Sequence, residues 1–263
     1  MLYDDQATDF DERAGLPADA CEAVAESLVD IGGLTVGDPV LEIGAGTGML
    51  SIPLIRRDVH YVGFDQSPAM LAVFSEKIAS AGLAAQLHVA DGNQRWPAED
   101  GSIALVFCAR ALHHLNDDHV VAETLRVLKP GGRLVLGRVR RPNNSVKSTM
   151  RKQMRAILEA EGYFGRSHNA RANAVFAELE HHGAIAVQQR EAAHWTGTHR
   201  PADSISAWRE KQGLAGIDVP PDVKERVLEQ LRGWAAERYG DIEIPREQDE
   251  FFELDGIIMP RMD

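Results

Sequence analysis

The stretch VLEIGAGTGML, residues 40–50, sets the interpretation of the whole chain. It joins a short apolar run to a loop that carries glycine at positions 44, 46 and 48. Glycine lets a backbone adopt positive φ and pass close beneath a ligand. A helix that begins after such a loop adds free N–H groups and a partial positive charge. The stretch therefore predicts a buried strand, a ligand-binding glycine loop and a helix.

Two familiar glycine loops do not fit this spacing. The dinucleotide fingerprint GxGxxG needs a third glycine where this chain has Met49. A P-loop needs Gly-Lys-Ser/Thr, and no such triplet follows here. An NAD(P) oxidoreductase is therefore disfavoured, although it remains the rival from another class of enzyme.

Apolar runs alternate with helical patterns through the first half of the chain. This order predicts an α/β, Rossmann-like, mostly parallel sheet with helices on both faces. Two later apolar runs, at 184–198 and 250–260, bring the predicted sheet to seven strands. The predicted strands of the first half are 39–44, 60–64, 85–90, 102–109 and 133–139, and the predicted helices are 17–33, 49–57, 67–82 and 117–132.

The alternation breaks after Val139. Helical patterns then cover 146–164, 171–183 and 201–240, the last one interrupted by DVPPD. Such stretches are too long to be simple connections between strands, which predicts a helical cap. We therefore expect a core formed by 1–141, 171–198 and 249–263, and cap segments for substrate selection at 142–170 and 199–248.

The pattern E-x-G-x-G-x-G directly after the first strand resembles the first motif of class I S-adenosylmethionine-dependent methyltransferases. The small-molecule enzymes of the ubiquinone/menaquinone methyltransferase group are the nearest type. The resemblance implies that Glu42 serves the cationic methionine end of the cofactor, directly or through water. It also implies that the loop backbone runs alongside the cofactor, at Gly44, Ala45, Gly46 and Gly48. A glycine-rich turn that binds nothing is the structural alternative.

Later positions match the same family in the expected order. Asp65 ends the second predicted strand, where an acid accepts hydrogen bonds from both ribose hydroxyls. The resemblance implies that Gln66 and Met70 flank the adenine. It also implies that Asp91 accepts from the adenine amino group and that Gly92 donates its N–H to a ring nitrogen. A solvated acid at the end of a strand is the alternative for Asp65.

The run GSIALVFCARALHHLND, residues 101–117, is similar to a further family motif, although Ala104 stands where an Asp is usual. The resemblance places the backbone of Ala109 and Arg110 beside the methionine moiety. It also makes Arg13, in the N-terminal FDERAGLP segment, a candidate partner of the cofactor carboxylate.

The resemblance implies methyl transfer from S-adenosylmethionine to the O, N or C atom of a small-molecule acceptor, with S-adenosylhomocysteine as product. His113 and His114 are candidate bases, because an unperturbed histidine titrates near pH ~6.5; a structural role is the alternative. Four arginines could form an anion site, which would favour an anionic acceptor, or could be solvated. These arginines are Arg110, Arg138, Arg140 and Arg141, and the candidate lining residues of the acceptor pocket are His168, His194 and Trp195.

Composition narrows the class of partner. The chain of 263 residues has a net charge of −12, which disfavours nucleic acid. Its two cysteines match no metal pattern, and no apolar run is long enough to span a membrane. We therefore expect a cytoplasmic monomer or homodimer without a metal. A cofactor-binding protein that transfers no methyl group, and a methyltransferase that acts on a macromolecule, stay open as alternatives.

Overall fold

The computed structural model describes residues 10–11, 15–165, 168–211 and 213–261. The chain divides into two compact units, and each has its own core. Unit 1 comprises Met1–Val139, His168–Ala193 and Phe252–Asp263, and unit 2 comprises Arg140–Ser167 and His194–Phe251.

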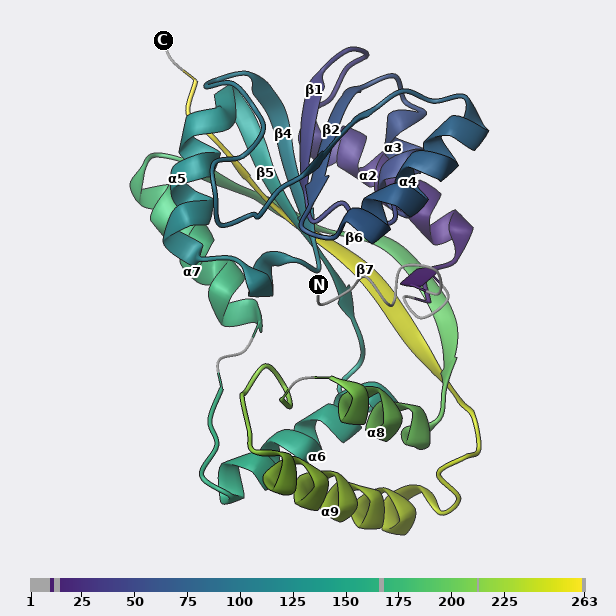
Figure 1. Cartoon of the computed structure of the whole chain (residues 1–263). Helices are drawn as coiled ribbons and strands as arrows, with labels where there is room; N and C mark the ends of the chain where they lie inside the picture. Colours follow the sequence, from purple (N-terminus) through teal and green to yellow (C-terminus); the bar gives the residue numbers. More distant parts are fainter. Residues whose placement is uncertain (1–9, 12–14, 166–167, 212, 262–263) are drawn as a thin grey trace. The chain divides into compact units, whose positions relative to one another are not determined.

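A seven-stranded sheet of order β3-β2-β1-β4-β5-β7-β6 organises the fold (Figure 1). The first five strands pair in parallel. The chain runs outward from β1 in one direction to β2 and β3, and in the other direction to β4 and β5. Such a reversal opens a crevice at the carboxyl ends of the two central strands. The strands are β1 Pro39–Ile43, β2 His60–Asp65, β3 Gln86–Val89, β4 Ile103–Ala109, β5 Leu128–Arg140, β6 Ile185–His199 and β7 Arg246–Ile258.

The last strand runs antiparallel to β5. The N–H of Met259, just beyond the end of β7, donates to the carbonyl of Gly132 near the start of β5 at 2.8 Å. The Gly131 N–H donates to the Pro260 carbonyl at 3.2 Å. The predicted Rossmann-like, seven-stranded, mostly parallel sheet is therefore confirmed.

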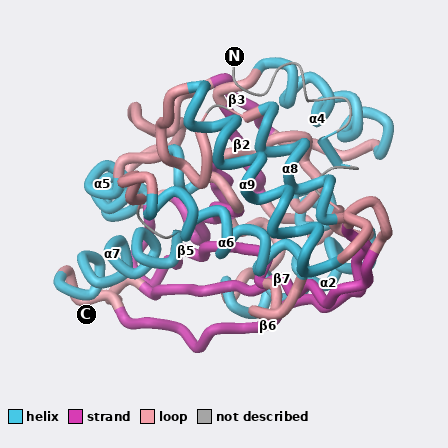
Figure 2. The backbone as a smooth tube through the Cα atoms, turned by 90° about the horizontal axis from the view of Figure 1, so that it is seen from below, coloured by secondary structure: helices cyan, strands magenta, loops and turns pink. Residues whose placement is uncertain are grey.

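Helices cover both faces of the sheet in unit 1. Helices α2 (Ala18–Gly32), α3 (Ser51–Ile55) and α4 (Pro68–Ala81) lie on one side, and α5 (Asp117–Val127) and α7 (His168–His181) lie side by side on the other (Figures 1 and 2). The central strand β4 is apolar along its whole length and buried at six of its seven residues, as expected for a strand covered on both faces.

Local sequence signals explain where two of these helices begin and end. Ser67 caps α4 by accepting the Met70 N–H, and Gly82 ends that helix in the left-handed region. The prediction of a helix over 117–132 was too long, because α5 ends at Val127 and β5 begins at Leu128. Pro130 has no N–H to donate and cannot continue a helix.

Unit 2 contains three helices in its described residues, α6 (Val146–Ala160), α8 (Pro201–Glu210) and α9 (Pro221–Tyr239). The predicted break at DVPPD separates α8 from α9. Their apolar faces form one buried cluster, whose fully buried members include Met150, Met154, Ile205, Val227 and Leu231. The prediction that these segments cap the carboxyl ends of β4 and β5 stays a prediction.

Candidate functional site

The glycine loop follows β1 directly, and its three glycines have different structural roles. All three have positive φ, between 55° and 77°. A Cβ on Gly44 would lie 2.5 Å from Cβ of Ala111, and one on Gly48 would lie 2.1 Å from the Phe74 ring. A Cβ on Gly46 would meet nothing nearer than 4.0 Å. Gly44 and Gly48 therefore allow close packing, whereas Gly46 presents bare backbone to open space.

Asp65, at the end of β2, is tied to this loop. One carboxylate oxygen accepts the N–H of Gly46 at 3.0 Å, and the other accepts the N–H of Ser67 at 2.9 Å. Each oxygen of a carboxylate can accept more than one hydrogen bond. The side chain is partly exposed, so both oxygens keep accepting capacity for a ligand beside the loop.

Glu42, on β1, is a buried acid that is only 3% exposed. Its Oε2 accepts hydrogen bonds from Ser51 Oγ at 2.7 Å and from Tyr61 OH at 2.8 Å. Burial raises the pKa of Glu42 to about 7; these two hydrogen bonds oppose that rise, and the nearby charge of Asp65 adds to it. Within the described part of the chain, Oε1 makes no hydrogen bond.

The loop after β3 is tied to the loop after β4. Asp91 accepts the N–H of Asn93 at 2.9 Å, which fixes a tight turn. Asn93 then donates to the carbonyl of His114 at 3.1 Å and accepts the N–H of Asn116 at 2.7 Å. A Cβ on Gly92 would lie 2.5 Å from Leu115. Asn93 is a positioning residue that sequence reasoning missed, although an Asn after Asp-Gly is a typical turn signal.

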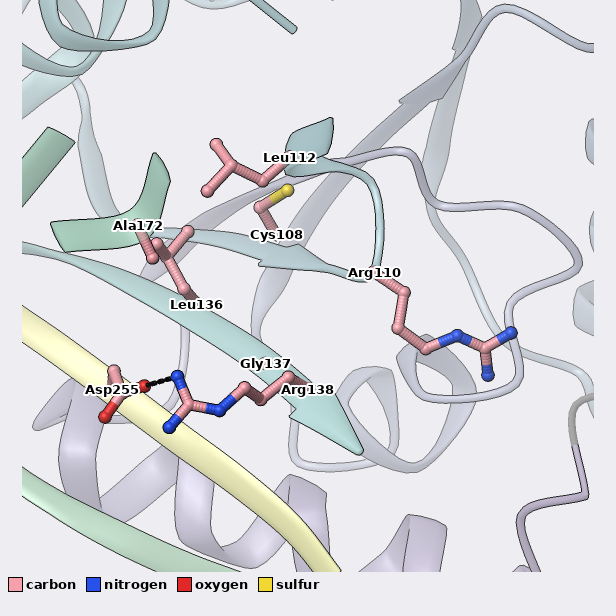
Figure 3. A pocket seen from close by; sticks show the side chains of 8 residues that line it. All are labelled: Cys108, Arg110, Leu112, Leu136, Gly137, Arg138, Ala172 and Asp255. Carbon is pink, nitrogen blue, oxygen red and sulfur yellow. Dashed lines mark ion pairs between the residues drawn. The ribbon is translucent and has the colours of Figure 1, made fainter. Parts of the chain in front are cut away.

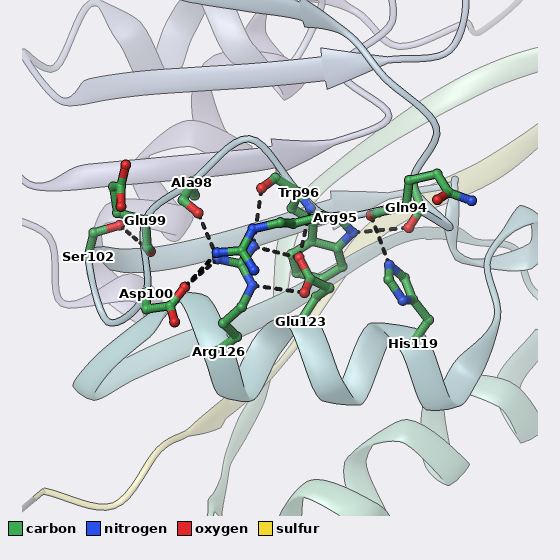
Figure 4. Close-up of polar contacts among 11 residues, drawn as sticks. Gln94, Arg95, Trp96, Ala98, Glu99, Asp100, Ser102, His119, Glu123 and Arg126 are labelled. Atoms are coloured by element: carbon green, nitrogen blue, oxygen red, sulfur yellow. Dashed lines mark hydrogen bonds and ion pairs between the residues drawn. The ribbon is translucent and has the colours of Figure 1, made fainter.

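An ionic cluster around the buried Glu123 anchors the same loop to α5 (Figure 4). The Glu123 carboxylate accepts the N–H of Trp96 at 2.7 Å and the Arg126 guanidinium at 2.6 Å. Arg126 also donates to the Trp96 carbonyl at 3.1 Å and pairs with Asp100 at 2.8 Å. Trp96 is 2% exposed, so it packs in the core.

Beyond β4 the chain turns sharply at Arg110, a non-glycine residue with φ of 62°. Its N–H donates to the carbonyl of Gly137, and its guanidinium lies 5.6 Å from the centre of the Phe10 ring. Arg110 also lines a small pocket between β4, β5, β7 and α7 (Figure 3). The other lining residues are Cys108, Leu112, Leu136, Gly137, Arg138, Ala172 and Asp255.

Of the four arginines of the candidate anion site, Arg138 is already paired with acids, and the site as a whole stays a prediction. Arg138 pairs with Asp255 at 2.7 Å and with Glu253 at 2.9 Å. Burial raises the pKa of Asp255, as does the charge of Glu253, while Arg138 lowers it. Since two acids surround this one guanidinium, Arg138 supplies no surplus positive charge.

The candidate bases lie on a short 3-10 helix, Leu112–His114, that follows β4. Both rings are exposed, and their centres are 3.8 Å apart. Burial of part of the His114 ring lowers its pKa, Arg171 lowers it further, and Asp65 opposes the shift.

Arg171, on α7, holds this segment and was also missed from the sequence. It donates to the carbonyl of His113 at 2.9 Å and to Asp117 at 2.7 Å, and it also contacts the Leu115 carbonyl. An arginine on a distant helix carries no local signal of such a contact.

The remaining residues predicted for the cofactor site and the acceptor pocket differ in their exposure. Ala45 and Met70 are buried, Gln66 is exposed, and Ala109 ends β4. Arg13 and the side chain of His168 lie outside the described residues.

In unit 2, the His194 ring stacks on the Phe251 ring, with 4.5 Å between the ring centres. Its Nε2 lies 3.0 Å from Oδ1 of Asp249. Trp195 is 9% exposed and its Nε1 has no partner in the described structure. Among described residues, no group of three His, Cys, Asp or Glu side chains could hold a metal. No described helix is long and apolar enough to cross a membrane.

The chain is similar in sequence and fold to known methyltransferases. Residues 40–132 match the family described as a methyltransferase domain. An uncharacterized methyltransferase of Mycobacterium tuberculosis (strain H37Rv) is 27% identical over 198 residues, which cover 73% of this chain and 71% of that protein. The demethylmenaquinone methyltransferase of Tropheryma whipplei (strain Twist) is 31% identical over 127 residues, 48% of this chain and about half of that protein, 52%.

The fold itself also has solved counterparts. The YcgJ protein of Bacillus subtilis aligns with 91% of this chain and 99% of its own, at a TM-score of 0.58 and 17% identity. That likeness concerns the fold, while the matched domain covers the glycine loop, Asp65 and the segment after β4. On this match and the similar sequences, residues 40–132 form a methyltransferase domain of the S-adenosylmethionine-dependent kind, and the solved structure shares the fold.

Proposed function

We propose that the crevice at the carboxyl ends of β1, β2 and β4 binds S-adenosylmethionine for methyl transfer to a small-molecule acceptor. The observation that supports it best is the meeting of Glu42, Gly46 and Asp65 at one loop. Gly46 offers open backbone, and Asp65 holds that backbone by its N–H. The open backbone at Gly46 leaves room for a ligand, and Glu42 and Asp65 place two acidic side chains beside it. This negative charge would favour a cationic nucleoside.

Asp65 would accept the ribose hydroxyls. Its two oxygens are already oriented by the amides of Gly46 and Ser67, so the carboxylate loses little freedom when a ligand binds. Hydrogen bonds to a charged acceptor contribute about 1.5–3 kcal/mol each. The loop after β3, with Asp91 and Gly92, would meet the adenine.

Glu42 would balance the ammonium group of the methionine end. Its pKa of about 7 leaves it partly protonated near neutral pH, and a nearby cation favours the ionised form. Binding should therefore release a proton from Glu42. Ser51 and Tyr61 hold Oε2, which leaves Oε1 to face the ligand or a bridging water.

The bound cofactor supplies an electrophilic methyl group on a sulfonium, whose departure needs no acid. The protein's part is then alignment of the acceptor and exclusion of water. Where the accepting atom carries a proton, we favour His114 as the base. Its lowered pKa keeps the ring neutral at pH 7, and only the neutral ring can accept that proton. His113 stands beside it.

The segments 142–170 and 199–248 are proposed to select the acceptor. They contain the three described helices of unit 2 and carry none of the cofactor motifs. A binding protein that transfers no methyl group would use the same loop but need no acceptor site.

The test is a transfer assay with S-adenosylmethionine labelled on its methyl group, incubated with the protein and a fractionated cell extract. We expect label in a small-molecule fraction, and less of it with the Asp65→Ala variant at a cofactor concentration below saturation. Label that stays on the cofactor in every fraction would favour the binding protein, and label on protein or nucleic acid would favour a macromolecular acceptor.

A further inference from the structure

Lys77, on α4, is a charged residue that reaches the glycine loop of unit 1. Its ammonium donates a hydrogen bond to the carbonyl of Thr47 at 3.0 Å. Phe74, three positions earlier on the same helix, packs so close to Gly48 that a Cβ there would lie 2.1 Å from its ring. Residues three apart on a helix share one face. One face of α4 therefore holds the loop by an apolar contact and by a charged one.

The same ammonium also binds Asp11, in the short described stretch that precedes the core. Lys77 donates to one carboxylate oxygen of Asp11, and the Thr47 hydroxyl donates to the other. Asp11 stands 36 positions before Thr47 and 66 positions before Lys77 in the chain. Each of the three residues thus contacts the other two, and we call them the Lys77 cluster.

The buried residue of the Lys77 cluster makes it more than a surface ion pair. The side chains of Lys77 and Asp11 are 32% and 38% exposed, and an ion pair with that much access to water contributes little by itself. Thr47, however, is only 2% exposed. Both ions bind it, one at its carbonyl and one at its hydroxyl, so the charges are joined to the backbone of the loop itself.

Phe10, the neighbour of Asp11 in the chain, contacts a different loop. Its ring centre lies 5.6 Å from the guanidinium carbon of Arg110, directly after β4. Asp11 instead contacts the loop that follows β1. Because β1 and β4 are adjacent strands, these two consecutive residues connect the two loops that border the crevice between them. Breaking the Lys77 cluster would release one end of this connection.

We propose that Lys77 and Asp11 are positioning residues of the cofactor site, which act through Thr47 to fix the glycine loop and to slow release of the cofactor. This inference rests on the proposed function, since it takes the ligand of the loop to be S-adenosylmethionine. Neither side chain is assigned a contact with the reacting atoms. The hold on the loop needs no ligand, so it can be measured in the free protein.

The first measurement is hydrogen exchange of the full-length protein without ligand. Lys77→Met removes the ammonium and keeps an unbranched side chain, so amides at 44–50 should exchange at least about threefold faster, while those of α5 should not change. Lys77→Arg should restore slow exchange, because its guanidinium can donate to both partners. Glu76→Gln, at the exposed neighbouring position on α4, is the matched control and should exchange like wild type.

The second measurement is the binding kinetics of S-adenosylhomocysteine, followed by surface plasmon resonance on the same variants. Lys77→Met should raise the dissociation rate about tenfold and leave the association rate within about twofold, because charge-assisted hydrogen bonds that hold the closed site are lost. Lys77→Arg should again restore the wild-type rate.

Asp11→Asn tests whether the two ions act as a pair. The amide keeps an oxygen for Thr47 but loses the acceptor for Lys77, so dissociation should be about threefold faster. In a protein that already carries Lys77→Met, the same substitution should add nothing, since its partner is gone.

Unchanged exchange at 44–50 in Lys77→Met would overturn the hold on the loop. Faster exchange together with wild-type kinetics of S-adenosylhomocysteine would overturn the role in cofactor binding. A loss that Lys77→Arg does not restore, with a lower melting temperature, would leave Lys77 only a structural role. A wild-type protein that binds no S-adenosylhomocysteine would overturn the proposed function and the cofactor role together, whereas the exchange data would still decide whether Lys77 holds the loop.

Discussion

Glu42 is a carboxylic acid in a site that removes nearly all of its water. Ser51 and Tyr61 donate to one of its oxygens, yet the pKa still lies at about 7. The folded protein therefore holds a proton that the unfolded chain, with the ordinary pKa of 4.5, has already released. Such a group lowers stability at neutral pH, and a role in binding a cation gives a reason to keep it.

The first prediction concerns Glu42→Gln, which keeps an acceptor for Ser51 and Tyr61. A raised pKa in the folded state makes stability fall as pH rises from 4.5 through 7. Glutamine cannot ionise, so the variant should gain about 3 kcal/mol relative to wild type between pH 4.5 and pH 8. Urea unfolding of both proteins at both pH values measures this change. Any effect of the amide on stability that does not depend on pH cancels in the comparison.

The control for that experiment is Glu76→Gln, on the exposed side of α4. It removes one negative charge without touching a buried site. A stability difference between Glu42→Gln and wild type that is the same at both pH values would contradict the buried, protonated Glu42.

The second prediction concerns Asp65. Asp65→Ala should weaken S-adenosylhomocysteine binding at least about tenfold, because two charge-assisted hydrogen bonds are lost. Asp65→Asn keeps one acceptor oxygen and should fall between alanine and wild type. Calorimetry on variants with unchanged circular dichroism gives the values, and an Asp65→Ala protein with the wild-type dissociation constant would remove Asp65 from the site.

Among the elements, the loop after β3 depends on α5 for its position. Glu123 is 8% exposed and binds both Trp96 and Arg126, whereas Asp100, the other acid on Arg126, has a side chain that is 69% exposed. A buried charged hydrogen bond contributes more than an exposed ion pair. Because both acids bind the guanidinium of Arg126, replacing each acid in turn compares a buried partner with an exposed one.

We predict that Glu123→Ala lowers the free energy of unfolding by about 2 kcal/mol or more, since it leaves the Trp96 N–H without its acceptor. Asp100→Ala should have a far smaller effect. Denaturant unfolding at pH 7 compares the two, and equal losses would show that burial does not set the strength of this cluster.

Element types were largely predictable from the sequence, and some boundaries were not. The Ser67 cap with Pro68 and the glycine at 82 mark α4 at both ends. The helix before β5 was predicted too long because the prediction ended it at Lys129, Pro130 and the two glycines, which already belong to the strand. Only the pairing of Leu128 with Ile103 on β4 shows that the strand begins before the proline.

Some candidate site residues could likewise be found from the sequence, and others could not. The glycine loop and Asp65 are local features of strand ends, so their positions in the fold could be predicted from the sequence, while their roles were implied by the family resemblance and stay predictions. Asn93 and Arg171 act across long sequence separations, and no local pattern reports such contacts. The sequence suggested an anion site of four arginines, but it gave no sign that the acids pairing with Arg138 and Arg141 come from β7, over 100 residues later.

For the whole molecule, the division into two units suggests a division of labour. The cofactor motifs lie in unit 1, whereas His194 lies in unit 2, against Phe251 and Asp249. If unit 2 selects the acceptor, His194→Ala should change turnover of an acceptor and keep the S-adenosylhomocysteine dissociation constant within about twofold. Steady-state kinetics beside calorimetry gives both values, and a large loss of cofactor affinity would contradict the division.

The central claim is that the loop at residues 44–48 holds an adenosyl amino acid and not a dinucleotide. Calorimetric titration of the full-length protein with S-adenosylhomocysteine, and separately with NAD, tests it most directly. We expect one S-adenosylhomocysteine site per chain, weakened in Asp65→Ala, and no heat of binding from NAD. Saturable binding of NAD together with no binding of S-adenosylhomocysteine would contradict it.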